Sequence, residues 1–277
     1  NPLPFDVEFH PSLYCGLKCA YCPNFTARGS KYKEQDYGAP FEEIAREVRE
    51  LKNSGELRAR LRGHFRELRA AGGEWVIVSG GMEPVEDGFS IDILEEGRAA
   101  GFNTRLVTTG IKLTNPLFLK KFNGSKERLF DFLLTHVDDL QISLDFDNRN
   151  EYLRAKGLTI TNPQAFDMVM ENVRVLTARK AELIRMGYEA ADNTKIGKNI
   201  LEPPDSNNPR LATISLAPLV LKSNYDKFER LADFCFQLGV DRMKVRRLKH
   251  ETYDLRYELT DDEERLALES LRRAEKK

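Results

Sequence analysis

Near its N-terminus the sequence reads Leu13-Tyr-Cys-Gly-Leu-Lys-Cys-Ala-Tyr-Cys-Pro-Asn24. The CxxxCxxC spacing puts Cys15, Cys19 and Cys22 within eight residues, so three thiolates can turn toward one point. Thiolates are soft ligands that suit iron–sulfur clusters, zinc or copper. A structural zinc site closes its shell with a fourth cysteine or histidine, and the remaining cysteine, Cys235, lies far along the chain. The stretch therefore predicts a metal centre that keeps one position for a ligand.

Length, charge and cysteine count restrict the class of protein. The 277 residues fit one large domain or two small ones. The 43 basic and 44 acidic residues nearly balance, which argues against a nucleic-acid partner. Clustered cysteines suit a reducing compartment better than a disulfide framework. Because no apolar run of membrane-spanning length and no signal-peptide pattern occurs, we expect a cytoplasmic protein without a membrane partner.

Strand-like and helix-like segments alternate along the chain. The predicted strands are 5–10, 74–79, 104–109, 140–145, 211–221 and 242–248. The predicted helices are 41–51, 57–68, 91–100, 116–122, 126–136, 163–186 and 228–238. This alternation predicts an α/β fold with a parallel sheet and helices outside it. Six units are too few for a closed eight-stranded barrel, so we expect an open, partial (β/α)6 barrel.

The same pattern suggests how the chain is divided. We assign residues 1–250 to the partial barrel and residues 251–277 to a C-terminal helical segment packed on it or extending from it. Thr260 and Glu263 have the spacing of a capping box and are predicted to open that last helix. The polar stretches 26–40 and 188–209 are predicted loops, and a role in closing over a substrate is a hypothesis.

Polar residues alternate along several predicted strands. Because side chains alternate between the two faces of a strand, each set points one way. The sets are Asp6, Glu8 and His10; Gln141, Ser143 and Asp145; Thr213 and Ser215; Lys244 and Arg246. They predict a polar cavity inside the barrel; the alternative is that they are edge positions or are satisfied by salt bridges. Glu8 and His10 adjoin the cysteine loop and are candidate catalytic residues for substrate handling or proton transfer.

The cysteine spacing, with Tyr21 before the last cysteine and Pro23-Asn24 after it, resembles the radical S-adenosylmethionine (radical SAM) superfamily. The resemblance implies the same open barrel. It also implies a 4Fe–4S cluster on Cys15, Cys19 and Cys22, with S-adenosylmethionine (SAM) on the open iron. A one-electron donor such as flavodoxin or ferredoxin would reduce the cluster, and a 5′-deoxyadenosyl radical would then abstract hydrogen from the substrate.

Further motifs resemble the family's SAM contacts. Gly80-Gly81-Met82-Glu83-Pro84 resembles the GGE motif that binds the SAM amino group, with Met82 inserted, so the role passes to Glu83. The stretch 142–145 resembles the fourth-strand ending whose serine contacts SAM. Tyr21 is either a backbone contact near the adenine or a packing aromatic, and Arg154 either pairs with the SAM carboxylate or is a solvated loop arginine. The residues expected to contact SAM are Tyr21, Gly80, Gly81, Glu83, Ser143, Asp145 and Arg154.

The sequence is compatible with several reactions and substrates. No cysteine follows Cys235, so the chain as given is expected to hold one cluster, without a cysteine-rich auxiliary extension. We expect an oxidoreductase, lyase or isomerase of natural-product biosynthesis that epimerises, dehydrogenates or eliminates a polar small molecule, such as a sugar, aminocyclitol or nucleoside. A peptide substrate is the second reading. A zinc- or cluster-binding module without catalysis is the alternative from another class. The basic run 244–250 either meets an anionic group of the substrate or simply ends a strand.

Overall fold

The computed structural model describes residues 5–11, 17, 19, 21–22, 50–51, 54–79, 83–86, 88–190, 210–247 and 259–276. Several predictions fall outside these residues. They concern Cys15, Gly80 and Gly81, the helix over 41–49, and the loops 26–40 and 191–209.

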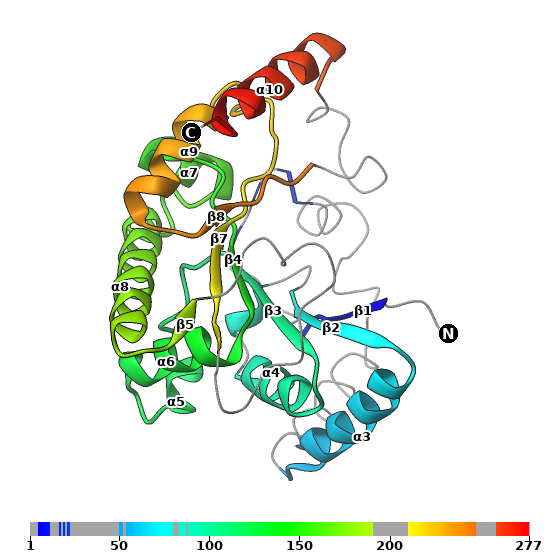
Figure 1. Ribbon diagram of the computed structural model, residues 1–277. Coiled ribbons are helices and arrows are strands. Elements are labelled where there is room, and N and C mark those ends of the chain that lie inside the picture. The colour runs from blue at the N-terminus through cyan, green and yellow to red at the C-terminus, as the bar shows by residue number, and fades with distance from the viewer. Residues whose placement is uncertain are drawn as a thin grey trace, which may run out of the picture.

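One parallel sheet organises the described chain (Figure 1). Its six strands are β1 (Phe5–Phe9), β2 (Gly73–Val78), β3 (Asn103–Thr108), β4 (Asp139–Ile142), β7 (Thr213–Leu216) and β8 (Arg242–Met243). They lie in the order β1-β2-β3-β4-β7-β8, and each neighbouring pair is parallel. The predicted α/β fold is confirmed, and β1 and β8 are the free edges of the described sheet, as in an open barrel.

The predicted fifth strand is interrupted. The short strand β6 (Arg210–Leu211) pairs with β5 (Glu189–Ala190) in a separate sheet. The backbone N–H of Ala212 donates to the Leu134 carbonyl (2.7 Å), and β7 then enters the main sheet. Residues 210–216 include no glycine or proline that would mark this change of partner, so the sequence predicts one strand.

Helices join successive strands, and Figure 1 shows α3, α4, α6 and α8 along the outer side of the sheet. The helices are α3 (Glu56–Ala70), α4 (Phe89–Ala99), α5 (Pro116–Lys120), α6 (Lys126–His136), α7 (Arg149–Lys156), α8 (Ala165–Arg185), α9 (Phe228–Leu238) and α10 (Asp261–Ala274), with a 3-10 turn, η2, at Pro84–Glu86. The helix α7 was not predicted from the sequence, because few of its residues are apolar. No described helix has the length and apolar character needed to cross a membrane.

The core lies between the sheet and these helices. It includes Val76 and Leu106 from the strands and Val173 from α8, all fully buried. Cys235 on α9 is also buried, and burial raises the pKa of its thiol to about 12. An inert thiol packed among apolar side chains is the usual state of a structural cysteine.

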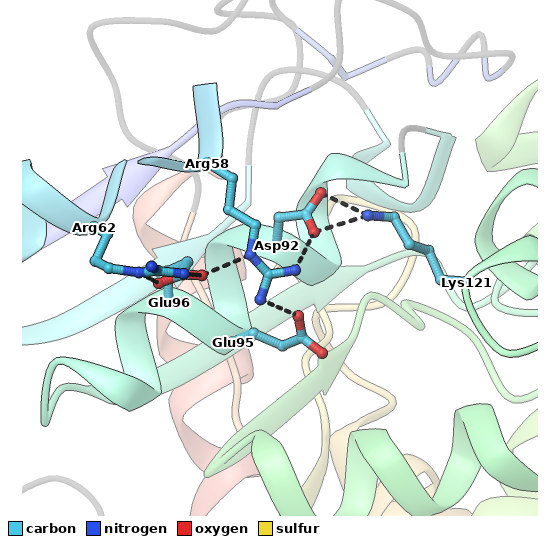
Figure 2. Close-up of polar contacts among 6 residues, drawn as sticks. All are labelled: Arg58, Arg62, Asp92, Glu95, Glu96 and Lys121. Carbon is cyan, nitrogen blue, oxygen red and sulfur yellow. Dashed lines mark hydrogen bonds and ion pairs between the residues drawn. The ribbon is translucent and has the colours of Figure 1, made fainter. Parts of the chain in front are cut away.

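An ion-pair network ties α3 to α4 (Figure 2). Arg58 pairs with Asp92 (3.0 Å), Glu95 (2.8 Å) and Glu96 (2.6 Å). Arg62 also pairs with Glu96 (2.8 Å), and Lys121 pairs with Asp92 (2.7 Å). The hydrogen bonds from Arg62 and Arg58 lower the pKa of Glu96 to about 2 against the opposing effect of burial. These carboxylates are matched by basic partners, so we assign the network to stability.

The C-terminal helix α10 packs on α9. Its N-terminus has the predicted capping box, in which the Thr260 side chain accepts from the Glu263 amide. The Ser270 hydroxyl accepts from the Phe228 amide at the start of α9 (3.0 Å). The division of the chain at residue 250 remains a prediction.

Candidate active site

The cysteine loop follows β1 at the carboxyl edge of the sheet. The Cys22 amide donates to the Cys19 carbonyl (3.0 Å), which closes a turn containing two of the three predicted ligands. Both cysteines come from this one turn, and two soft sulfur donors at this spacing are the donor set that iron–sulfur clusters use. The described residues contain no converging group of three histidine, cysteine or acidic side chains. Completing the site therefore depends on Cys15.

Tyr21 anchors this loop to the segment that follows β4, in the middle of the sheet, through a group that we call the Asp145 cluster: Tyr21, Asp145 and Lys156. The Tyr21 hydroxyl donates to Asp145 Oδ2 (2.5 Å), and Lys156 Nζ donates to the Tyr21 hydroxyl (2.7 Å). Lys156 also pairs with Asp145 Oδ2 (2.7 Å), while Asp145 Oδ1 accepts from the Leu219 amide (2.8 Å). All three side chains of the cluster are buried. The cysteine loop is thus bonded to the end of β4 and to α7.

The Asp145 cluster is an ionised pair with a neutral phenol. Burial acts to raise the pKa of Asp145, but the charge of Lys156 and several hydrogen bonds outweigh it and lower this pKa. Burial acts to lower the pKa of Lys156, and the charge of Asp145 holds it well above the ordinary lysine value. Burial, followed by the charge of Asp145, raises the pKa of Tyr21. Asp145 is fully buried and both its oxygens already accept from protein donors, and its expected contact with SAM remains a prediction.

Glu83 lies between the ends of β2 and β3. It accepts from the Thr108 hydroxyl (2.5 Å) and the Thr109 amide (2.9 Å), and only 3% of its surface is exposed. Burial raises the pKa of its carboxyl group despite these hydrogen bonds. A buried carboxylate without a described basic partner is costly to keep ionised unless a cation approaches it.

A cavity of about 210 Å³ opens beside Glu83. Its lining includes Leu17 of the cysteine loop, Thr109 and Lys112 after β3, and Leu158 after α7. A carboxylate at the wall of a cavity that also touches the cysteine loop can receive the ammonium group of a ligand bound next to that loop. The structure therefore brings two of the sequence-predicted elements, the cysteine loop and Glu83, to one cavity.

Gly110 fixes the backbone that presents the Thr109 amide to Glu83. Its φ is +79°, and a Cβ atom there would lie 2.9 Å from Ile142 Cγ2. We expect Gly110→Ala to lower the free energy of unfolding by about 1–3 kcal/mol, through backbone strain and overpacking. Gly63→Ala is the matched control: Gly63 lies within α3 with open space around it, so alanine should add up to about 1 kcal/mol. Urea denaturation measures both, and equal effects of one sign would contradict this account.

The polar faces of the central strands meet, but at their base they form ion pairs. Asp139 at the start of β4 accepts from Arg105 (2.8 Å), Gln141 (2.6 Å) and Arg242 (3.2 Å). Ser143, one residue past β4, accepts from Arg246 Nη2 (3.0 Å). The alternative of satisfied salt bridges therefore describes the region around Asp139, while Ser143 lies higher, toward the carboxyl edge.

Other predicted site residues lie elsewhere. Glu8 and His10 are more than half exposed at the end of β1, with His10 Nε2 3.3 Å from Glu8 and the Ser79 hydroxyl donating to the same carboxylate. Arg154 is exposed on α7 and does not line the cavity. The roles assigned to these residues remain predictions.

Lys156 is the site residue that sequence reasoning missed. The signal was present in the two ends of α7: Asn148 accepts from the Glu151 amide as an N-cap, and Gly157 has the left-handed conformation of a helix end. Between these ends, Tyr152 and Lys156 are four residues apart and share the buried face. Recognising the caps would have placed Lys156 toward the core, although not its partners.

Solved structures provide the comparison with known proteins, since no protein-family model matches the sequence. The structure of Streptococcus suis SuiB bound to precursor peptide SuiA superimposes with a TM-score of 0.57 at 13% identity, covering 98% of this chain and 46% of SuiB. SuiB bound to S-adenosylmethionine gives 0.52 at 14%, covering 99% and 44%. TYW1 with a lysine–pyruvate adduct gives 0.50 at 16%, covering 96% and 72%. The chain spans less than half the length of SuiB, and over that span the two proteins share a fold.

Proposed function

We propose that this protein is a radical SAM enzyme. In this proposal Cys15, Cys19 and Cys22 hold a 4Fe–4S cluster, and SAM occupies the adjacent cavity. The observation that supports this proposal most directly is that Leu17 of the cysteine loop and the buried Glu83 line the same cavity. The fold shared with SAM-bound SuiB supports the same proposal.

The chain's own residues would bind and orient SAM and shield the site. Glu83 would accept a hydrogen bond from the ammonium group of SAM, and the positive charge would keep the buried carboxylate ionised. The Asp145 cluster would hold the cysteine loop in place through Tyr21. When bound, the cluster and SAM supply the electron transfer and the 5′-deoxyadenosyl radical that takes a hydrogen atom from the substrate. A flavodoxin or ferredoxin would serve as the electron donor.

The substrate is proposed to be a polar small molecule, such as a sugar, aminocyclitol or nucleoside, that is epimerised, dehydrogenated or subject to elimination. The polar side chains of β4 and β7 that face the barrel support this choice. A peptide substrate is the second candidate, supported by the likeness of the fold to that of SuiB, which has been solved bound to its precursor peptide. Incubation with deuterated candidates of both kinds, followed by mass spectrometry of 5′-deoxyadenosine, separates the two.

Anaerobic reconstitution with iron and sulfide tests the proposed chemistry. We expect a brown protein with about four irons per chain and absorption at about 400 nm, which forms 5′-deoxyadenosine from SAM and dithionite. Cys19→Ala and Cys22→Ala should lose both properties, because each removes a thiolate ligand. Cys235→Ala is the control and should keep both. A colourless protein with one tightly held zinc would support the non-catalytic binding module instead.

A further inference from the structure

A group of basic side chains faces the barrel from β3 and β8. We call it the cationic group: Arg105, Arg242, Lys244 and Arg246. The last three alternate along one strand and its extension, so they point to one side of the sheet. Arg105 joins them from the other side of Asp139, which is fully buried. Asp139 Oδ2 lies 2.8 Å from Arg105 Nε, 3.2 Å from Arg242 Nη2 and 4.0 Å from Lys244 Nζ.

Asp139 carries a single negative charge, and the cationic group around it carries several positive charges. Arg105 and Arg242 are within hydrogen-bond distance of it, whereas the ammonium of Lys244 is too far away to donate to it. Lys244 donates no hydrogen bond to any residue in the described part of the chain, and about a third of its side chain is exposed. Its charge is therefore available to a ligand that enters the barrel.

Arg246 lies beside Lys244 at the carboxyl edge. Its guanidinium has neutral partners, the Ser143 hydroxyl (3.0 Å) and the Ala217 carbonyl (3.2 Å), and no described carboxylate pairs with it. Its Nε is buried and has no hydrogen-bond partner among the described residues. A buried donor of this kind is costly unless an acceptor reaches it. The planar guanidinium presents its donors in the geometry that carboxylate and phosphate groups accept.

The titration of Lys244 reports the local charge. Burial lowers its pKa to about 8, and repulsion from Arg105, Arg242 and Arg246 contributes, while Asp139 acts in the opposite direction. The net field at Lys244 is positive even with Asp139 present. An incoming anion would reduce that repulsion.

We propose that Lys244 and Arg246 form a subsite for a carboxylate or phosphate group of the substrate, next to Ser143 at the carboxyl end of the barrel. The identity of the ligand as a substrate rests on the proposed function, whereas the anion site itself does not. In parallel α/β sheets, ligands bind at this edge. The subsite narrows the proposed polar substrates to those that carry an acidic group, such as a sugar acid or a phosphorylated sugar or nucleoside.

Inorganic phosphate is the probe, and the full chain without reconstitution is the sample. We expect calorimetry to detect phosphate binding that weakens about tenfold or more in Arg246→Gln and in Lys244→Gln, because each removes a charge-assisted contact. The control is Arg272→Gln, which makes the same charge change at an exposed position on α10 and should bind like the parent chain. Binding should also weaken above about pH 8, as Lys244 loses its proton, and Lys244→Gln should lack this step. Circular dichroism checks that each variant is folded, and if Arg246→Gln does not fold, the loss of phosphate binding in Lys244→Gln tests the subsite by itself.

The carboxylate of SAM is the other possible source of the anion. After reconstitution, SAM should bind to Arg246→Gln as it does to the parent chain. A tenfold loss of SAM affinity in Arg246→Gln would assign the subsite to SAM and overturn the substrate assignment. Absence of phosphate binding up to about 50 mM, or equal binding in the parent and both variants, would overturn the anion site. None of the phosphate results depends on the cluster, so a failed reconstitution leaves this test intact.

Discussion

We expect Lys156→Met to lower the free energy of unfolding by about 3–5 kcal/mol, one of the largest effects of any single substitution in this chain. The change leaves the buried Asp145 carboxylate without its 2.7 Å ion pair, and the Leu219 amide and Tyr21 hydroxyl remain as its donors. The cost is the burial of an unpaired charge rather than the loss of the pair's own attraction. Urea denaturation of the parent and variant chains measures it.

Two comparisons separate this cause from general damage to the core. The double variant Asp145→Asn/Lys156→Met removes both charges and should recover most of the loss, because neither partner is left ionised. Lys227→Met breaks a more exposed ion pair with Glu151 on the same helix, α7, and should cost no more than about 1 kcal/mol. If the double variant is as unstable as Lys156→Met, packing around the lysine stem, and not charge, stabilises the site.

The pH dependence of this stability has a defined sign. The pKa of Asp145 is lowered on folding, so its contribution is present above the ordinary aspartate value and is lost as pH falls through the lowered pKa. The pKa of Lys156 is raised, so its contribution is present below the ordinary lysine value and is lost as pH rises through the raised pKa. The contribution of the pair to the stability of the parent chain should therefore stay constant between about pH 5 and pH 9. The difference from Lys156→Met should grow as pH rises above the ordinary aspartate value, because Asp145 in the variant is buried without its cation and must ionise at a cost.

The sheet could be predicted because its signal is local. Strand β2 is largely apolar, β3 lies between Gly101 and Gly110, and the strand order follows the chain because helices join successive parallel strands. The ends of β7 and β8 could not be predicted to the residue, since they depend on where neighbouring strands stop pairing. Helix α7 was missed because tertiary contacts of two or three side chains, and not a full apolar stripe, hold it against the core.

The sequence predicts the cysteine ligands and Glu83 as site residues, and these roles remain predictions, whereas it gives no sign of the charge pairing around them. Lys156 and Tyr21 are 135 residues apart, and no pattern in the sequence relates them. The alternation of polar residues along β4 could be recognised in the sequence, yet whether such a face lines a cavity or joins an ion network depends on how many opposite charges meet there. Asp139 pairs with arginines from two other strands, whereas Ser143 contacts one arginine, Arg246, which pairs with no described carboxylate. The number of opposite charges that meet at each residue depends on the folded structure and cannot be derived from the sequence pattern.

Glu83→Gln should separate binding from stability. We expect the variant to bind SAM about 10- to 100-fold more weakly in the reconstituted protein, because a hydrogen bond between two charged groups becomes one with a neutral acceptor. The amide oxygen of glutamine can still accept from the Thr109 amide, so the fold is retained. Isothermal titration with SAM measures the affinity. Glu86→Gln is the control, because Glu86 lines the same cavity but is already paired with Lys112, and its affinity should change little.

The same substitution should leave the unreconstituted chain equally stable or more stable at neutral pH. Burial raises the pKa of Glu83, so the folded state holds its proton to higher pH than the unfolded state does, and stability falls as pH rises through that pKa. The glutamine side chain of the variant does not titrate, so the difference in unfolding free energy should favour Glu83→Gln increasingly from about pH 4.5 upward. SAM binding to the parent should change in the opposite direction, increasing with pH as the carboxylate ionises. If replacing Glu83 stabilises the chain without ligand and weakens SAM binding, the role of Glu83 is to bind SAM and not to stabilise the fold. If Glu83→Gln instead destabilises the chain and binds SAM normally, Glu83 is a structural acceptor for Thr108 and Thr109, and the ammonium site lies elsewhere.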